Sequence, residues 1–533
     1  MIGSTIIYAI TPFGAASTPD SLYYYNSVEN FNSGHGLMIT SFDLYGPSML
    51  PLTTWPPLYP LALSFLSSIL PHNEIEIIAR YFNIICLTIN SLIFLKLSQK
   101  IISPLFGVAI TIFLIIQPPI LTVYTYSWSE TLFIPLILIS YYFSIKAFNI
   151  HNRKTKLIYY SISTIFIVLS CYTRYIGIAF LPALFIMIFF DLRKHPENTL
   201  ILLATTSTIF LFGFSPLIIY NYLKTGYLSG AERSLYKTHL FSDFIDLFYT
   251  LKLNFFNFSS STFPSIWLIF LIIILISIYL TFKKNSLFIS LKYTPSNEES
   301  FPIPFIIFST LLWVMSYLIL LIIMRNLQKF DEIDTRLISP IVPFIILFLS
   351  TFSSSYIAKP VPPKIKFPLI VLLFTWVIAQ SIYSLAVFRE SISSWHYNIS
   401  PGLPHRSKPY NNFTGLKKIA KELYNHLNLQ EDSLILSDYS KPMLIKYLFS
   451  PSTVKTLPSN LTSDHIQLSN SLANKRGVIM ITTPEGMDSI NRSYGDSIKL
   501  KLIQSEAFHA NRPAVIGIID LPLPLLSNFS NPD

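Results

Sequence analysis

Charged residues and cysteines are both scarce in this chain of 533 residues, and each shortage excludes a class of protein. Asp, Glu, Lys and Arg make up 12% of the residues, whereas a soluble globular protein has about 25%. Hydrophobic residues make up 51%, and the mean hydropathy is +0.51. Cys86 and Cys171, the two cysteines, both lie in apolar segments, which excludes a disulfide framework or a cysteine metal site outside a membrane. The composition predicts a polytopic membrane protein.

Basic residues exceed acidic ones, with a formal net charge of +10 and a pI of about 9.2. They lie mostly in short loops between apolar runs, so the excess does not indicate nucleic-acid binding, and we expect none. The N-terminal run, residues 2–16, lacks a basic n-region and a clear cleavage site, and we interpret it as a signal anchor.

Eleven apolar runs predict a polytopic α-helical protein with about eleven transmembrane helices. These runs are residues 2–16, 77–95, 103–122, 131–148, 157–172, 175–190, 198–222, 263–282, 303–324, 337–355 and 367–388. The stretch from Pro57 to Leu70 is shorter and begins with two prolines, so we interpret it as a re-entrant or interfacial helix.

The distribution of Lys and Arg among the loops predicts a cytoplasmic N-terminus. With that orientation the inside loops carry 13 Lys and Arg, and the longer outside loops before residue 337 carry 8. The inside loops are residues 96–100, 151–156, 191–198, 283–292 and 359–366. Counting residues 57–70 as a span would invert every later loop and place the basic excess outside.

The composition changes near residue 389, where long apolar runs stop and polar residues, Pro and Asn become common. We therefore expect a membrane domain over residues 1–388, with a long first outer loop at 17–76, and a small extracytoplasmic α/β domain over 389–533. In the second domain, strands are predicted at 433–438, 477–483 and 514–520, and a helix at 441–449.

Charged side chains gather in three segments on the predicted outer side. The first, residues 18–80, contains Asp20, and the second, 124–133, contains Glu130 at the mouth of a span. The third, residues 325–343, contains Arg336 just before another span. A transporter is expected to carry ionisable residues near span centres, discontinuous helices or two related halves, and no such pattern is visible.

The order of short motifs in these segments resembles that of the GT-C membrane glycosyltransferases, which include protein O-mannosyltransferases and lipid A aminoarabinose transferase. The matching stretches are "PDSLYYY", "TWPPLYPLAL", "EIIARYFN", "SWSETLF", "YTRYIGIAFLP", "IYNYLKTGYLSG" and "TRLISPIVP". Each motif alone is weak, but the ordered set covers residues 18–343. One departure is Trp55, which stands where the aminoarabinose transferase has a Lys before two prolines.

The resemblance implies transfer of a sugar from a polyprenyl-phosphate donor to a protein, lipid or glycan acceptor on the outer side of a cell membrane. Asp20 is then the candidate base for the acceptor hydroxyl, and Glu130 is a second candidate catalytic carboxylate. The resemblance assigns phosphate or sugar binding to Arg80, Arg174, Arg336, Tyr24 and Trp55.

Each candidate also has an ordinary structural interpretation. Asp20 can cap a helix that opens at Ser21, and Glu130 can close a capping box that begins at Ser127. The arginines can anchor span ends in headgroups, and Tyr24 and Trp55 can belong to an interfacial aromatic belt.

An acidic cluster later in the chain raises the question of a metal. Asp331, Glu332 and Asp334 carry enough carboxylates for a divalent cation. An acidic outer loop is more often simply solvated, and we assign no metal ligands.

Two alternatives to a glycosyltransferase of this kind stay open. A polysaccharide ligase or polymerase is expected to work from a large late outer loop such as residues 223–262. A non-enzymatic transporter or assembly protein of the cell envelope would use the C-terminal domain as its working part.

Overall fold

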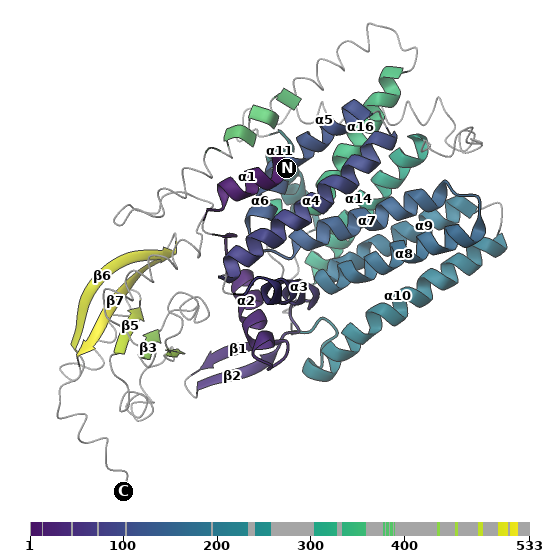
Figure 1. The fold of residues 1–533 in the computed structure, drawn as a ribbon. Helices are drawn as coiled ribbons and strands as arrows, with labels where there is room; N and C mark the ends of the chain where they lie inside the picture. Colours follow the sequence, from purple (N-terminus) through teal and green to yellow (C-terminus); the bar gives the residue numbers. More distant parts are fainter. Residues whose placement is uncertain are drawn as a thin grey trace. The chain divides into compact units, whose positions relative to one another are not determined.

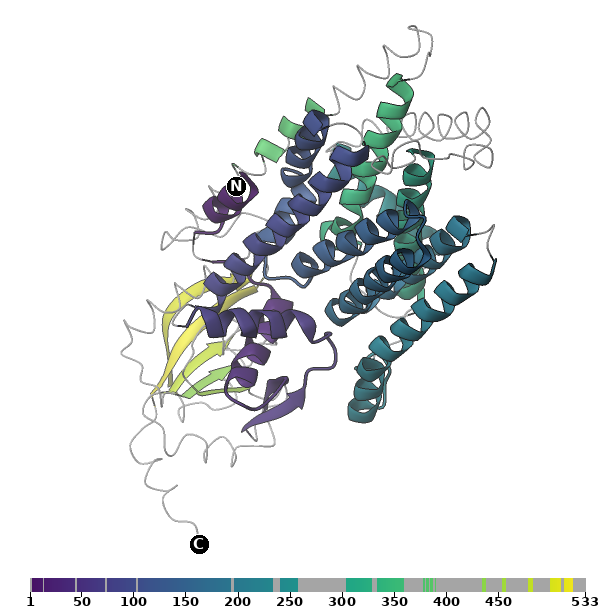
Figure 2. The same cartoon turned by 45° about the vertical axis from the view of Figure 1, so that its right-hand side comes forward.

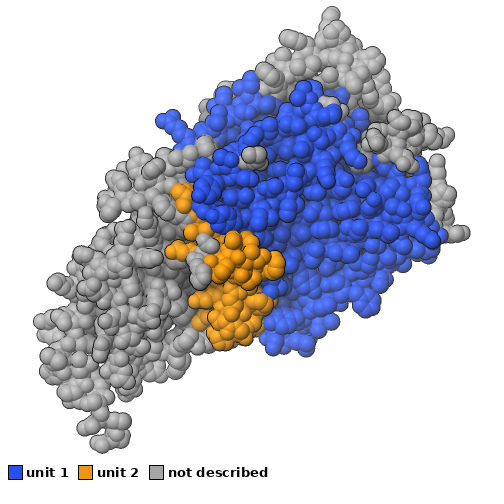
Figure 3. Space-filling model, viewed as in Figure 1, with its two compact units in different colours: residues 1–9, 53–62, 80–389 blue, residues 10–52, 63–79, 390–533 orange. Residues whose placement is uncertain are grey.

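The computed structural model describes residues 2–256 apart from short gaps, 303–327, 333–358, separate positions between 377 and 389, and five strands near the C-terminus. The chain divides into two compact units, coloured blue and orange in Figure 3. The first unit contains residues 1–9, 53–62 and 80–389, and the second contains 10–52, 63–79 and 390–533.

Long apolar helices dominate the first unit (Figure 1). In the part of the chain that the structure describes, six segments are long and apolar enough to cross a membrane. They lie in α4 (Ile75–Ile101), α7 (Glu130–Phe148), α8 (Arg153–Thr173), α10 (Pro196–Thr225), α14 (Ile303–Leu327), and the run of α15 (Thr335–Ile338), η2 (Ser339–Ile341) and α16 (Val342–Ala358). The protein is therefore a multi-pass membrane protein, as predicted.

One apolar segment is discontinuous, contrary to the expectation that the sequence contains no discontinuous helix. The predicted span at 103–122 forms α5 (Pro104–Ile115) and α6 (Pro118–Thr125), which meet at a bend of 57°. Pro118 disfavours a helical conformation at the preceding residue, Gln117, and this accounts for the break. Gln117 has an extended backbone at that point.

Apart from α2 (Pro19–Asn32), which belongs to the second unit, the other main helices of the described residues are also shorter. They are α1 (Ile2–Ile10), α3 (Leu58–Ile69), η1 (Tyr175–Ala179) continuing into α9 (Phe180–Leu192), and α11 (Leu240–Phe256). At 12 residues, α3 is about 18 Å long, too short to cross a hydrocarbon core of roughly 30 Å. The predicted span at 263–282 and most of that at 367–388 lie outside the described residues, so the predicted total of eleven is not established.

Close packing holds together the helices α7, α8, α9, α14 and α16. α7 and α8 lie side by side (Figure 1), where Ser140 and Ser163 are joined by a hydrogen bond of 2.9 Å between their hydroxyls. Small residues allow such close approach of membrane helices. The buried ring of Trp313 on α14 lies 5.2 Å from Tyr141 of α7, 4.9 Å from Phe180 of α9 and 5.5 Å from Phe344 of α16.

Within the predicted first outer loop, residues 17–76, the part that belongs to the second unit is folded and is not an irregular connection. It contains α2 (Pro19–Asn32) and an antiparallel hairpin of β1 (Met38–Asp43) and β2 (Gly46–Pro51), seen in purple in Figure 2. Asn26 Oδ1 accepts a hydrogen bond from the Thr40 backbone N–H at 2.6 Å, and Asn30 Nδ2 donates to the Met38 carbonyl at 2.9 Å. These two amides dock the helix onto the hairpin.

The C-terminal strands form one mixed sheet in the order β4-β3-β5-β7-β6. Their bounds are β3 (Leu434–Ser437), β4 (Thr453–Thr456), β5 (Val478–Thr482), β6 (Lys499–His509) and β7 (Arg512–Asp520). β3 is parallel to β4 and β5, and β7 is antiparallel to β5 and β6. The three predicted strands coincide with β3, β5 and β7. The predicted helix at 441–449 lies outside the described residues, so the α/β class of this domain stays a prediction.

Candidate functional site

Glu130 is the first residue of α7, and its side chain is only 1% exposed. The segment that leads to it is held from two sides. Asn83 of α4 donates from Nδ2 to the carbonyls of Tyr124 at 3.0 Å and Tyr126 at 2.9 Å. Tyr59, in the first turn of α3, shares a hydrogen bond of 2.8 Å with Ser127 Oγ. These hydrogen bonds hold the backbone that leads to Glu130, and they do so independently of the ion pairs of its carboxylate.

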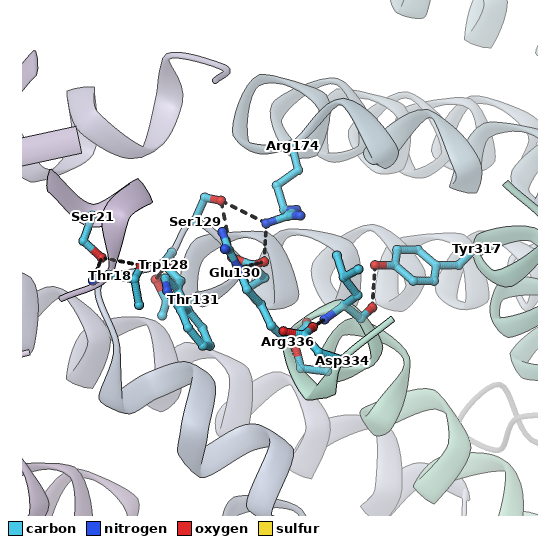
Figure 4. A network of polar contacts seen from close by, with 12 residues as sticks. Thr18, Ser21, Trp128, Ser129, Glu130, Thr131, Arg174, Tyr317, Asp334 and Arg336 are labelled. Carbon is cyan, nitrogen blue, oxygen red and sulfur yellow. Dashed lines mark hydrogen bonds and ion pairs between the residues drawn. The ribbon is translucent and has the colours of Figure 1, made fainter. Parts of the chain in front are cut away.

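Two arginines from distant parts of the sequence converge on this carboxylate (Figure 4). Arg174 ends α8 and pairs with Glu130 Oε1, and Arg336 of α15 donates from Nε to the same oxygen at 2.5 Å. Ser129 Oγ donates to the other oxygen, Oε2, at 3.4 Å. The start of α7, the end of α8 and the start of the run from α15 to α16 therefore meet at one end of the helix bundle.

Neighbouring groups fix the direction of Arg336. Asp334 Oδ1 caps α15 by accepting the Leu337 N–H at 3.0 Å, and Tyr317 of α14 donates its hydroxyl proton to the Leu337 carbonyl at 2.8 Å. The guanidinium carbon lies 4.9 Å from the ring centre of Trp128, a cation–π distance. The Trp128 ring is in turn stacked on Tyr126, at 4.5 Å between ring centres.

Arg174 and Arg336 carry two positive charges, and Glu130 is the carboxylate paired with both. The Asp334 carboxylate also interacts with the two arginines, so the four side chains together are formally neutral. The Glu130 carboxylate is buried, whereas the side chains of Arg174 and Arg336 are 19% and 15% exposed. Of the paired groups, the two guanidinium groups are thus the more accessible ones, and their remaining N–H donors can bond an anion.

The capping box expected between Ser127 and Glu130 is wrong. Ser129 is the N-cap of α7 and makes no side-chain capping bond. The Ser127 hydroxyl bonds Tyr59 instead, and the Glu130 carboxylate bonds the two arginines. The Glu130 carboxylate therefore pairs with the two arginines and does not play the capping role that the local sequence pattern predicted.

Asp20 lies in the first turn of α2 in the second unit and is half-buried. The N-cap of this helix is Thr18, whose backbone N–H donates to Ser21 Oγ at 3.0 Å. Capping by Asp20 is thus not what starts the helix. Burial, and then the nearby negative charge of Asp20, raise the pKa of the Tyr23 hydroxyl one turn further on.

The other candidate residues have different surroundings. The guanidinium of Arg80 on α4 is buried and lies 4.5 Å from the ring of Tyr8 and 5.2 Å from that of Tyr81. Trp55 is half-buried in the connection between β2 and α3. Tyr24 is 1% exposed, so in this structure it is a core residue of the second unit.

The proposed acidic cluster is only partly described. Asp331 and Glu332 lie outside the described residues, and Asp334 serves as the cap of α15. Within the described part of the chain, no group of three His, Cys, Asp or Glu side chains is placed to hold a metal ion.

Sequence reasoning missed three supporting residues: Asn83, Tyr59 and Trp128. Asn83 had a usable signal, because a fully buried amide in an apolar span implies a polar partner. The contacts of Tyr59 and Trp128 depend on which helices pack together, and the sequence pattern does not contain that information.

Comparison with solved structures identifies the fold. The chain is similar to the crystal structure of ArnT from Cupriavidus metallidurans bound to undecaprenyl phosphate, with a TM-score of 0.56 and 10% identity. That match covers 100% of this chain and 98% of the other, and the apo form of the same ArnT matches over the same shares with a TM-score of 0.55 and 10% identity. The chain therefore has the fold of ArnT.

A weaker similarity, with a TM-score of 0.46 and 12% identity, links the chain to the oligosaccharyltransferase AglB from Archaeoglobus fulgidus. It covers 91% of this chain and 69% of that one. No protein-family model matches the sequence, and no curated protein matches it.

The ion-pair geometry predicts strong energetic coupling between Glu130 and Arg336. Glu130→Gln leaves two guanidinium groups beside a neutral amide and is expected to lower the free energy of unfolding by about 3 kcal/mol. In that background Arg336→Gln should be less harmful than in the wild type, with a coupling energy of about 1–3 kcal/mol. Unfolding of the purified protein in detergent micelles measures all four members of the cycle.

Glu232→Gln is the control, since Glu232 is exposed and lies in the same unit. Additive effects of the Glu130 and Arg336 substitutions would contradict the geometry.

Proposed function

We propose that the protein is a membrane glycosyltransferase that moves a sugar from a polyprenyl-phosphate donor to an acceptor on the extracytoplasmic side of a cell membrane. The observation that carries this proposal is the convergence of Arg174 and Arg336 on Glu130, at one end of a bundle with the ArnT fold. An ArnT crystal structure contains bound undecaprenyl phosphate, a ligand of the class proposed here.

The two arginines suit a phosphate that arrives from the lipid. A guanidinium has five N–H donors in a planar fork, so an arginine can bond Glu130 and a phosphate oxygen together. The positive charge of the two guanidinium groups compensates part of the phosphate charge, and a site near a span end lets the polyprenyl tail stay in the hydrocarbon. This assignment also supplies the phosphate contact that Trp55 cannot make.

The reaction needs little acid catalysis. The bond between the anomeric carbon and the phosphate oxygen breaks, and its electron pair leaves with polyprenyl phosphate. The acceptor oxygen forms the new bond to the anomeric carbon and loses its proton to a base. Positive charge beside the leaving phosphate stabilises the negative charge that develops there.

Asp20 is the proposed base, and Glu130 is assigned a positioning role. Asp20 is half-buried and is not the cap of its helix. Glu130 is fully engaged, because Oε1 is shared by two arginines and Oε2 accepts from Ser129. A carboxylate held in this way orients the guanidinium groups and is poorly placed to take a proton.

The donor class can be tested with a panel of polyprenyl-phosphate sugars. Purified protein in detergent should release free polyprenyl phosphate from at least one donor when a suitable acceptor extract is added, as measured by mass spectrometry of the lipid. The Arg174→Gln/Arg336→Gln protein should show at least a tenfold higher KM for that donor. Failure of the wild type to consume any donor across the panel would refute the proposed function.

A separate prediction concerns the base. Asp20→Asn removes the proton acceptor and should lower kcat by about 10²- to 10⁴-fold, with little change in the KM for the donor. Glu29→Gln is the matched control, because Glu29 is an exposed carboxylate on the same helix, α2, and should keep full activity. The test is steady-state kinetics on variants that elute from size exclusion like the wild type. Normal turnover by Asp20→Asn would remove Asp20 from the mechanism.

A further inference from the structure

Arg174 is followed in the chain by Tyr175, whose hydroxyl is fixed by two partners. The Tyr175 O–H donates to the Thr53 carbonyl at 2.8 Å and accepts from Asn221 Nδ2 at 2.8 Å. Thr53 lies just before the Pro-Pro turn, and Asn221 is fully buried near the end of α10. Tyr175 thus joins three distant segments within the first unit.

The same partners hold the turn that follows α10, residues 226–230. Asn221 Nδ2 also donates to the Leu228 carbonyl at 3.2 Å, and Thr53 Oγ1 donates to the Gly230 carbonyl at 2.6 Å. The hydrogen bonds form a closed ring, in which the turn is bonded to Asn221, Asn221 to Tyr175, Tyr175 to Thr53, and Thr53 to the turn. The turn is therefore connected through Asn221 and Thr53 to Tyr175, the residue next to Arg174.

Gly230 shows how tight this docking is. Its φ is +77°, and a Cβ atom at this position would lie 2.0 Å from the Thr53 carbonyl oxygen. Gly226, at the other end of the turn, also has a φ of +77°, but a Cβ atom there would meet nothing within 4 Å. Both positions favour glycine for their backbone conformation, and Gly230 alone of the two also requires it for contact.

The backbone at Arg174 explains why an anchor is needed there. Arg174 has an extended conformation, with φ −151° and ψ +130°, between the end of α8 and the start of η1. At such a junction the side chain is not directed by a continuing helix. An anchored neighbour on one side and the ion pair with Glu130 on the other define its direction.

We propose that Tyr175, with the turn at 226–230 docked against it, is a positioning residue for Arg174. The hydroxyl of Tyr175 fixes the direction from which the Arg174 guanidinium reaches Glu130 and the phosphate of the donor. This inference rests on the proposed function, because it places Arg174 at that phosphate.

Two matched pairs of variants test the proposal. Tyr175→Phe removes the hydroxyl, and Tyr222→Phe is its control, since Tyr222 is 57% exposed on α10. Gly230→Ala pushes the turn off Thr53, and Gly226→Ala is its control, with the same strained φ and no collision. Each variant is made in the full chain and compared by unfolding midpoint before use.

The first readout is the Kd for undecaprenyl phosphate, measured by native mass spectrometry. Tyr175→Phe and Gly230→Ala should each weaken binding about tenfold, the equivalent of one or two lost hydrogen bonds, and the controls should stay within twofold. In an Arg174→Gln background, Tyr175→Phe should have no further effect. A purely structural role predicts an equal loss in both backgrounds, and that outcome would overturn the proposal.

The second readout does not depend on the donor. Phenylglyoxal modifies accessible arginines, and peptide mass spectrometry follows its rate at Arg174. Tyr175→Phe and Gly230→Ala should raise that rate several-fold over the wild type and the controls. If the wild type binds no undecaprenyl phosphate, the proposed function fails and this rate alone decides the positioning role. An unchanged rate in both variants overturns it.

Discussion

The buried carboxylate of Glu130 is the constraint on which the site depends. Burying a carboxylate is strongly unfavourable unless it is paired, and here two guanidinium groups from α8 and α15 supply the pairing. The same pairing brings together three helix ends that are far apart in the sequence. The ion pairs therefore link the packing of the bundle to the placement of positive charge at one end of it.

The site is built in layers around that carboxylate. Asn83 and Tyr59 fix the backbone that leads to Glu130, and Trp128 lies against the guanidinium of Arg336. Tyr175 holds the junction at Arg174. Such supporting contacts matter for the proposed sugar transfer, because charge stabilisation works best when the charges are held in place beforehand.

Much of the membrane fold follows from the sequence, because the bilayer imposes long apolar helices and leaves a plain hydropathy signal. Residues 103–122 were predicted as one span, and the break at Gln117 was not predicted, although Pro118 and Pro119 mark it locally. The hairpin of β1 and β2 was missed because its sequence lacks strong alternation and because the amides of Asn26 and Asn30 stabilise it.

The candidate site, like the fold, was predicted from the sequence only in part. Glu130, Arg174 and Arg336 were singled out as rare charges beside apolar spans and through the family resemblance, and the structure brings these three together. Their mutual pairing, the aromatic contacts of Arg80 and the burial of Tyr24 depend on tertiary packing. The local sequence pattern predicted a capping box from Ser127 to Glu130, and this was wrong. A capping signature contains no information about arginines that are distant in the sequence.

The central claim is that Arg174 and Arg336, held by Glu130, bind the phosphate of a polyprenyl lipid. An experimental structure of the protein with bound undecaprenyl phosphate tests it most directly. The account predicts a phosphate oxygen about 3 Å from a guanidinium nitrogen of Arg174 or Arg336, with the ion pairs to Glu130 still formed. A phosphate bound at another place, with both arginines contacting only protein, would contradict it.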